Sequence, residues 1–136
     1  MLGYNSAYFS FAGRASRREF ARMSLRLVWV TMAIVVAAIF AAIQGFAASG
    51  YLAAALIALI WVASTAVAVR RLHDRGLSGW FAAIGLVFPL VEPAAAHFPI
   101  LLLAVFPLNI WLFVEIYLRR GVRGSNRYGT DPLVEA

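Results

Sequence analysis

Long apolar runs alternate with short basic segments along this chain. The four apolar runs cover residues 27–48, 51–69, 79–96 and 98–118. Three of them reach about 20 residues, the length at which a helix crosses the hydrocarbon core of a bilayer. The third is shorter and reaches this length only by including Glu92 and Pro93. The pattern predicts an all-α integral membrane protein with four transmembrane helices in a single domain, residues 1–136.

The segment before the first run, residues 8–26, has an amphipathic helical pattern. The stretch "SRRE" at 16–19 fits a capping box, in which the side chains of Ser16 and Glu19 each bond the other's backbone amide. From there, basic and apolar residues fall on opposite faces, with Arg18, Arg22 and Arg26 on one face and Phe20, Met23, Ser24 and Leu27 on the other. Such a segment lies at the head-group boundary, so we expect an interfacial helix before the first span.

The positions of the arginines predict an orientation. All 12 basic residues are arginines, and they lie before the first run, between the second and third, and after the fourth. The connections near 45–50 and 91–99 contain none. Four crossings therefore place every arginine on one side of the membrane. The positive-inside rule makes that side the cytoplasm, so both termini are predicted to be cytoplasmic, with residues 119–136 as a tail.

Composition narrows the class of protein further. The chain is 63% hydrophobic and 13% charged, against about 25% charged residues in a soluble domain. Its net charge is +6. Because the arginines alternate with membrane-length runs, anionic lipid head groups are a better partner than nucleic acid. The absence of cysteine excludes thiolate sites, and His73 and His97 fall on opposite sides of the predicted membrane, so we expect no metal and no cofactor.

Three segments resemble those of a known family. They are "FAGRASRREF" at 11–20, "RRLHDRGLSGW" at 70–80 and "NRYGTDP" at 126–132. In this order and spacing they closely resemble the signature segments of the DUF805 family of small bacterial inner-membrane proteins. The resemblance spans almost the whole chain. It implies a helical, multi-pass protein of the bacterial inner membrane and implies no established reaction.

All three segments lie on the cytoplasmic side of the predicted topology, where two interpretations stay open. In one, Asp74 pairs with Arg71, Arg14 or Arg127, and the cluster is a polar latch that ties the bundle together. In the other, the arginines line a site for an anionic group, because guanidinium binds phosphate bidentately. The residues that enter either interpretation are Arg14, Arg17, Arg18, Arg70, Arg71, His73, Asp74, Asn126 and Arg127.

Two polar residues, Asn109 and Glu115, lie within the fourth run. An acid inside a span is a functional candidate, and a proton or ion path through both residues would define a small oligomeric transporter or channel. Arg119 lies four residues beyond Glu115, which favours a local ion pair. The leading interpretation is therefore a non-enzymatic scaffold or accessory protein, whose arginine cluster binds anionic phospholipid or a protein partner. A homo-oligomer is also compatible with the sequence.

Three local patterns give further expectations. The stretch "GLSG" at 76–79 resembles a serine motif of rhomboid-type proteases, but it lies at the membrane surface without a base for Ser78, so we expect no enzyme. The stretch "SGY" at 49–51 predicts a tight turn between the first two spans. A row of small residues predicts close packing between spans and consists of Ala33, Ala37, Ala41 and Gly45.

Overall fold

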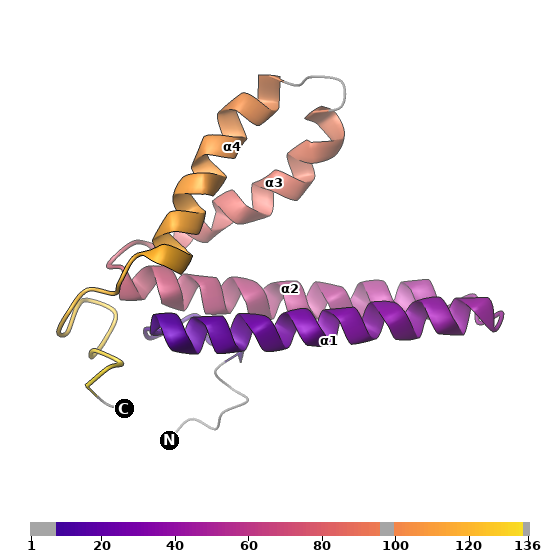
Figure 1. Ribbon diagram of the computed structural model, residues 1–136, viewed down its shortest axis with the longest axis horizontal. Helices are drawn as coiled ribbons and strands as arrows, with labels where there is room; N and C mark the ends of the chain where they lie inside the picture. The colour runs from indigo at the N-terminus through magenta and orange to yellow at the C-terminus, as the bar shows by residue number, and fades with distance from the viewer. Residues whose placement is uncertain (1–7, 96–99, 135–136) are drawn as a thin grey trace.

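The computed structural model describes residues 8–95 and 100–134, which form two helical hairpins. The helices are α1 (Arg17–Ile43), α2 (Ser49–Asp74), α3 (Ala82–Ala95) and α4 (Ile100–Phe113). A short 3-10 turn, η2 (Gly79–Phe81), precedes α3, and a π-helical turn, η3 (Val114–Leu118), continues α4. Helices α1 and α2 lie side by side, and the α3–α4 hairpin diverges from them at the end where η3 lies (Figure 1).

Three helices in the described part of the chain are long and apolar enough to cross a membrane. They are Arg17–Ile43, Ser49–Asp74 and the continuous Ile100–Leu118. The third predicted span differs, because α3 has 14 residues and extends only about 21 Å, against a hydrocarbon core of about 30 Å. The expectation of four membrane-length helices thus holds for three of the four runs. Residues 96–99, where the third predicted span ends and the fourth begins, lie outside the described residues, as do His97 and Pro99.

The predicted interfacial helix and first span are one helix, α1. No proline or glycine interrupts it between Arg17 and Ile43, so the backbone has no reason to bend. The arginine-bearing segment is therefore the first part of the membrane helix and not a separate element. Ser16 caps it as predicted, with its hydroxyl accepting from the amide of Glu19 at 3.3 Å. The Glu19 carboxylate lies instead 3.7 Å from the guanidinium of Arg70.

The reversal between α1 and α2 occupies residues 44–48, before the predicted turn at 49–51. Gly45 adopts a positive φ of 85°. The amide of Phe46 then donates to the carbonyl of Ala41 at 2.9 Å, as in helices that end at a glycine. The prediction of a turn at "SGY" is wrong because the helix ends earlier, at this glycine. Ser49 and Gly50 form the first turn of α2.

Apart from Ala41, the predicted row of small residues does not lie on the packing face of α1. Ala33, Ala37 and Gly45 are exposed. The half-buried positions of α1 continue instead from the buried Met23 through Leu27, Thr31, Ile34, Ala38 and Ala41. This set follows the 3.6-residue period of the helix, whereas a strict four-residue spacing drifts around the helix surface. Burial at the arginine-bearing end therefore sets which face of α1 packs, and the small-residue prediction is wrong for this pair.

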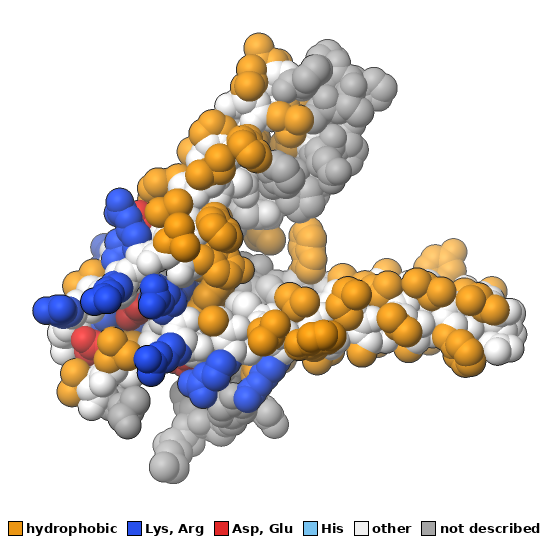
Figure 2. All heavy atoms as spheres, viewed as in Figure 1, with side chains coloured by type: hydrophobic (Ala, Val, Ile, Leu, Met, Phe, Trp, Pro, Cys, Tyr) orange, Lys and Arg blue, Asp and Glu red, His pale blue; other side chains and the backbone are white. Residues whose placement is uncertain are grey.

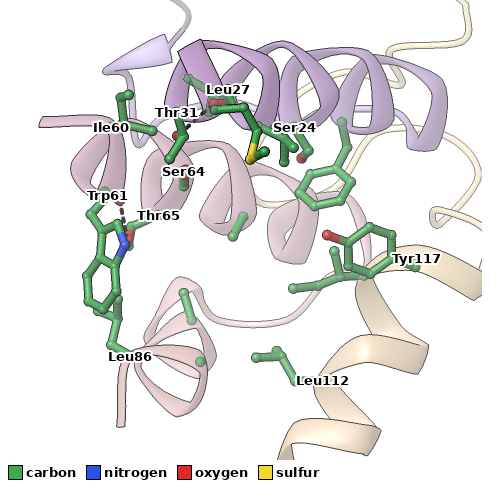
Figure 3. Close-up of a pocket in the computed structure, with 17 residues that line it drawn as sticks. Ser24, Leu27, Thr31, Ile60, Trp61, Ser64, Thr65, Leu86, Leu112 and Tyr117 are labelled. Atoms are coloured by element: carbon green, nitrogen blue, oxygen red, sulfur yellow. Dashed lines mark hydrogen bonds between the residues drawn. The ribbon is translucent and has the colours of Figure 1, made fainter. Parts of the chain in front are cut away.

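Buried apolar side chains gather where the two hairpins meet. They are Phe20, Met23, Val67, Val69, Leu72, Ala82, Leu112 and Ile116. Beyond them the hairpins enclose a cleft of about 460 Å³ (Figure 3). The hydroxyls of Thr31 and Thr65 point at this cleft but donate to carbonyls of their own helices, at 2.8 and 2.9 Å. The cleft therefore remains largely apolar, as expected of a surface at membrane depth.

Candidate functional site

The last turn of α2 lies at the centre of a polar junction, where the arginine and acidic side chains gather (Figure 2). The final carbonyls of a helix have no partner within it. Here the carbonyl of Asp74, the last residue of α2, accepts from the amide of Val122 at 2.9 Å. One turn earlier, the carbonyl of Arg70 also accepts from the amide of Ala15 at 3.1 Å. The side chain of Asn126 donates to the carbonyl of His73 at 2.9 Å. The segment before α1 and the segment after η3 therefore both dock on the end of α2.

Asp74 binds two arginines at the centre of this junction. Its Oδ1 accepts from Nε and Nη2 of Arg14 at 3.1 and 3.0 Å. Its Oδ2 accepts from Nη1 of Arg71, one turn earlier in α2. The side chains of Arg14, Arg71 and Asp74 are 1%, 0% and 4% exposed. We call these three residues the latch.

Every donor of Arg14 is used within the protein. Its five hydrogen bonds go to the carboxylate of Asp74, described above, and to the carbonyls of Val122, Gly124 and Gly129, at 2.5, 2.6 and 3.4 Å. A guanidinium has five N–H groups, so Arg14 has none left for a ligand. This arginine therefore holds the tail in place and does not bind an external anion.

Arg71 joins the two hairpins. Its Nε donates to the carbonyl of Ile116 at 2.9 Å, and its Nη2 donates to the carbonyl of Arg119 at 2.5 Å. Both carbonyls lie at the end of η3, where helical partners run out. Nη1 also lies 3.5 Å from the carbonyl of Ala15. One side chain from α2 thus caps the end of the fourth predicted span and contacts the segment before α1.

Gly121 approaches the latch so closely that no side chain fits. A Cβ atom placed on it would lie 2.1 Å from Oδ2 of Asp74 and less than 3.0 Å from the other two carboxyl atoms. The reasoning from sequence did not identify this residue. The sequence feature that could have indicated it is the stretch "RRGVRG" at 119–124, which follows a membrane helix directly.

The remaining predicted residues border the latch. The ring of His73 stacks on Tyr128 with centroids 3.8 Å apart, and its Nδ1 lies 3.1 Å from the carbonyl of Gly13. Arg127 lies over the same ring, with its guanidinium 4.7 Å from the centroid of Tyr128, and does not pair with Asp74. Arg70 is 6% exposed, lies 3.3 Å from the sulfur of Met23, and its Nε has no hydrogen-bond partner among the described residues.

Glu115 forms a second ion-pair group beside the latch. Its Oε1 lies 2.9 Å from Nη1 of Arg119, the local pair that the spacing predicts. Its Oε2 accepts from Nε of Arg75 at 3.0 Å, a contact across 40 residues of sequence that was not predicted. Asn109 lies apart from both and donates to the carbonyl of Val105 in its own helix at 3.0 Å.

The two partners of Glu115 should differ in their effect on stability. The side chain of Arg75 is 16% exposed and that of Arg119 is 60% exposed. Exposed ion pairs contribute about 1 kcal/mol or less. We expect Arg119→Ala to stay within this range and Arg75→Ala to lower the free energy of unfolding more, since it also frees the carbonyl of Arg120. Denaturant unfolding in detergent measures both, and equal losses would contradict the ranking.

A hollow of about 440 Å³ adjoins the latch at the start of α1, and Asp74 forms part of its lining. Its basic lining consists of Arg17, Arg18, Arg120 and Arg123. Arg17 makes one long hydrogen bond, 3.4 Å to the carbonyl of Leu118. The other three guanidinium groups donate to no acceptor in the described part of the chain. The predicted cluster thus separates into arginines that face inward and arginines that face this hollow. Arg120 and Arg123 were not among the predicted residues.

Asp131 also borders the hollow, as does Asp74 of the latch. The carboxylate of Asp131 accepts from the amides of Leu133 and Gly124 at 3.0 and 2.9 Å. These two hydrogen bonds lower the pKa of Asp131 below its ordinary value, first through Leu133 and then through Gly124. The carboxylate therefore stays ionised, and continues to hold the tail, to a lower pH than an unperturbed aspartate would.

The fold and the junction define a class: helical multi-pass membrane proteins whose hairpins are tied at one end by a buried arginine–aspartate cluster. The chain belongs to the family described as proteins of unknown function, DUF805, whose model matches residues 8–130. It is 30% identical to the uncharacterized protein YiiR of Escherichia coli K12, over 90% of this chain and 86% of that one. No solved structure matches it.

Two further relatives from Escherichia coli K12 are named inner membrane proteins. YhaH is 28% identical over 94% of this chain and 91% of its own length. YhaI is 30% identical over 92% of this chain and 87% of its own length. Together with three helices long enough to cross a membrane, these relatives place the chain in the bacterial inner membrane, as the family resemblance implied.

Proposed function

We propose that this protein is a non-enzymatic scaffold or accessory protein of the inner membrane, whose outward-facing arginines bind an acidic segment of a protein partner. One observation carries the proposal. The hydrogen bonds described above use every donor of Arg14. The hollow, by contrast, is lined by arginines that donate few hydrogen bonds within the protein, namely Arg17, Arg18, Arg120 and Arg123. Guanidinium groups in this position match carboxylates or phosphates bidentately.

The position of the hollow favours a partner in water over a lipid. Helix α1 has 27 residues and is about 40 Å long, about 10 Å longer than the hydrocarbon core. If the apolar end of α1 reaches the opposite boundary of the core, the first turns of the helix project into water. Arg17 and Arg18 lie on these turns and line the hollow. With four crossings and both termini in the cytoplasm, which we also propose, this end faces cytoplasmic proteins.

The competing proposal, transport through Asn109 and Glu115, has less support. Glu115 is 4% exposed, and both of its oxygens are paired with arginines. Asn109 satisfies a carbonyl of its own helix. Polar groups on a transport path exchange partners with a passing ion or proton, whereas these two have protein partners in place. No specific observation therefore favours transport as a second candidate function.

The test compares two pairs of arginines with equal charge. The protein is released from its own membrane and analysed by native mass spectrometry, and binding of a hexaglutamate peptide is titrated by fluorescence anisotropy. Each exposed ion pair contributes up to about 1 kcal/mol. Arg120→Gln/Arg123→Gln should thus lose the copurifying protein and weaken peptide binding about tenfold.

The matched control is Arg22→Gln/Arg26→Gln, which removes the same charge from α1 outside the hollow. It should keep both the partner and the peptide. Equal losses in the two variants would show that net charge alone attracts acidic ligands, which would overturn the proposal. A preparation in which wild type carries phospholipid at the hollow and no protein would overturn the choice of partner.

A further inference from the structure

A groove on α1 and α2 lies apart from the hollow and combines apolar walls with a basic end. It has a volume of about 670 Å³. Its walls are formed by α1, by α2 and by the segment before α1, and Arg26 lies at one end. The apolar and aromatic lining residues are Tyr8, Phe9, Leu27, Trp29, Val30, Leu59, Ile60 and Ala63. Because the two helices are antiparallel, Ala63 lies nearest the junction and Leu59 lies deepest among the three residues of α2. The groove therefore runs from the basic end of the hairpin towards the middle of the membrane.

The groove begins near the boundary of the hydrocarbon core and extends into the leaflet on the arginine side. If the last 20 residues of α1 occupy the hydrocarbon core, the boundary of the core falls near residue 24. Arg22 and Arg26 lie on either side of this level, one helical turn apart and both exposed. Arginine side chains near a helix end reach back to the interface. The guanidinium groups thus lie at the depth of lipid phosphates, and Leu27 and Val30 lie at the depth of acyl chains.

We infer that this groove binds an anionic phospholipid of the leaflet on the arginine side, with its phosphate at Arg22 and Arg26 and one acyl chain along Leu27, Val30 and Leu59. Charge complementarity selects this occupant, since Arg18, Arg22 and Arg26 follow one another at four-residue spacing along α1 and share one face of the helix. A second copy related by twofold symmetry would bring the same arginines face to face, which is unfavourable. Trp29, which is 68% exposed, also lines the groove and suits the glycerol level.

The site is distinct from the hollow of the proposed function and does not depend on it. The hollow is lined by Arg17, Arg18, Arg120 and Arg123, and the groove by none of them. A lipid in the groove would contact both helices of the first hairpin at once. It would therefore stabilise the hairpin in membranes that contain anionic lipid, by binding to the folded state.

The experiment titrates the purified full-length protein with phosphatidylglycerol or phosphatidylcholine of the same acyl chains and counts bound lipids by native mass spectrometry. Wild type should retain phosphatidylglycerol selectively. A basic residue near the surface contributes about 1 kcal/mol, so Arg22→Gln/Arg26→Gln should weaken this binding roughly tenfold to thirtyfold. Arg120→Gln/Arg123→Gln, which removes the same charge elsewhere, should leave it unchanged.

A second variant separates a groove from a merely basic surface. Leu59 is 57% exposed, so Leu59→Trp fills the groove from outside while both arginines remain. It should also lose the selectively bound lipid, with an unchanged melting temperature in detergent as evidence of folding. Retention of the lipid by Leu59→Trp would reduce the effect to surface electrostatics and overturn the inference. Equal binding of phosphatidylcholine, or equal losses in the two arginine variants, would overturn it as well.

Discussion

Replacing Asp74 by alanine is expected to lower the free energy of unfolding by about 3–5 kcal/mol. The substitution leaves Arg14 and Arg71 charged and without their acid, at side-chain exposures of 1% and 0%. Their attraction to Asp74 also positions donors for carbonyls of the tail and of η3. The loss should therefore exceed that of any single exposed ion pair. Denaturant unfolding in detergent micelles, followed by circular dichroism, measures it.

Two further variants help to interpret the loss of stability measured for Asp74→Ala. Asp74→Asn keeps the shape of the side chain and one carbonyl acceptor, so its loss should be smaller than that of alanine while remaining measurable. Asp131→Ala removes an acid whose two hydrogen bonds are exposed, and about 1 kcal/mol or less is expected. If Asp74→Ala unfolds at the same denaturant concentration as wild type, the latch contributes nothing to stability and the junction must be held by other contacts.

The helices were predictable from the sequence where apolar length dominates. The charge-free run at 27–48 and the run at 51–69 correspond to α1 and α2, but both helices extend further at their basic ends. The prediction ended the second span at Val69 because the stretch "RRLHD" is too polar for lipid. In the structure this stretch continues the helix, since its charges are buried against protein and are paired there. A hydropathy pattern assumes that lipid surrounds a membrane helix. It therefore does not predict a helix end that is buried against protein.

The residues of the latch could be predicted from the sequence, but their arrangement in space could not. Asp74 was recognised as the acid of its loop, with Arg14 and Arg71 among three possible partners, because few acids are available to so many arginines. Which arginines face inward depends on the docking of residues 119–131, which are separated from α2 by a whole hairpin. The contact between Arg75 and Glu115 spans 40 residues and leaves no local signature. The division of the arginines into latch and hollow is thus a property of the tertiary structure.

Replacing Gly121 by alanine is expected to lower the free energy of unfolding by about 1–3 kcal/mol, because it overpacks the junction. The added Cβ would meet all three carboxyl atoms of Asp74 at 2.1–2.8 Å. A flexible side chain could usually swing away from such a contact. The carboxylate of Asp74 is held by Arg14 on one oxygen and by Arg71 on the other, so any movement breaks an ion pair. Unfolding in the same detergent measures the loss.

Gly50→Ala is the matched control, because it adds the same methyl group where nothing lies within 4 Å. Gly50 lies in the first turn of α2, where alanine is a better helix former than glycine, so the control should be neutral or slightly stabilising. The combination of Gly121→Ala with Asp74→Ala tests the mechanism. Removing the carboxylate removes the clash, so the double variant should be no less stable than Asp74→Ala alone. Additive losses would instead show that Gly121 acts through its own backbone and not through the latch.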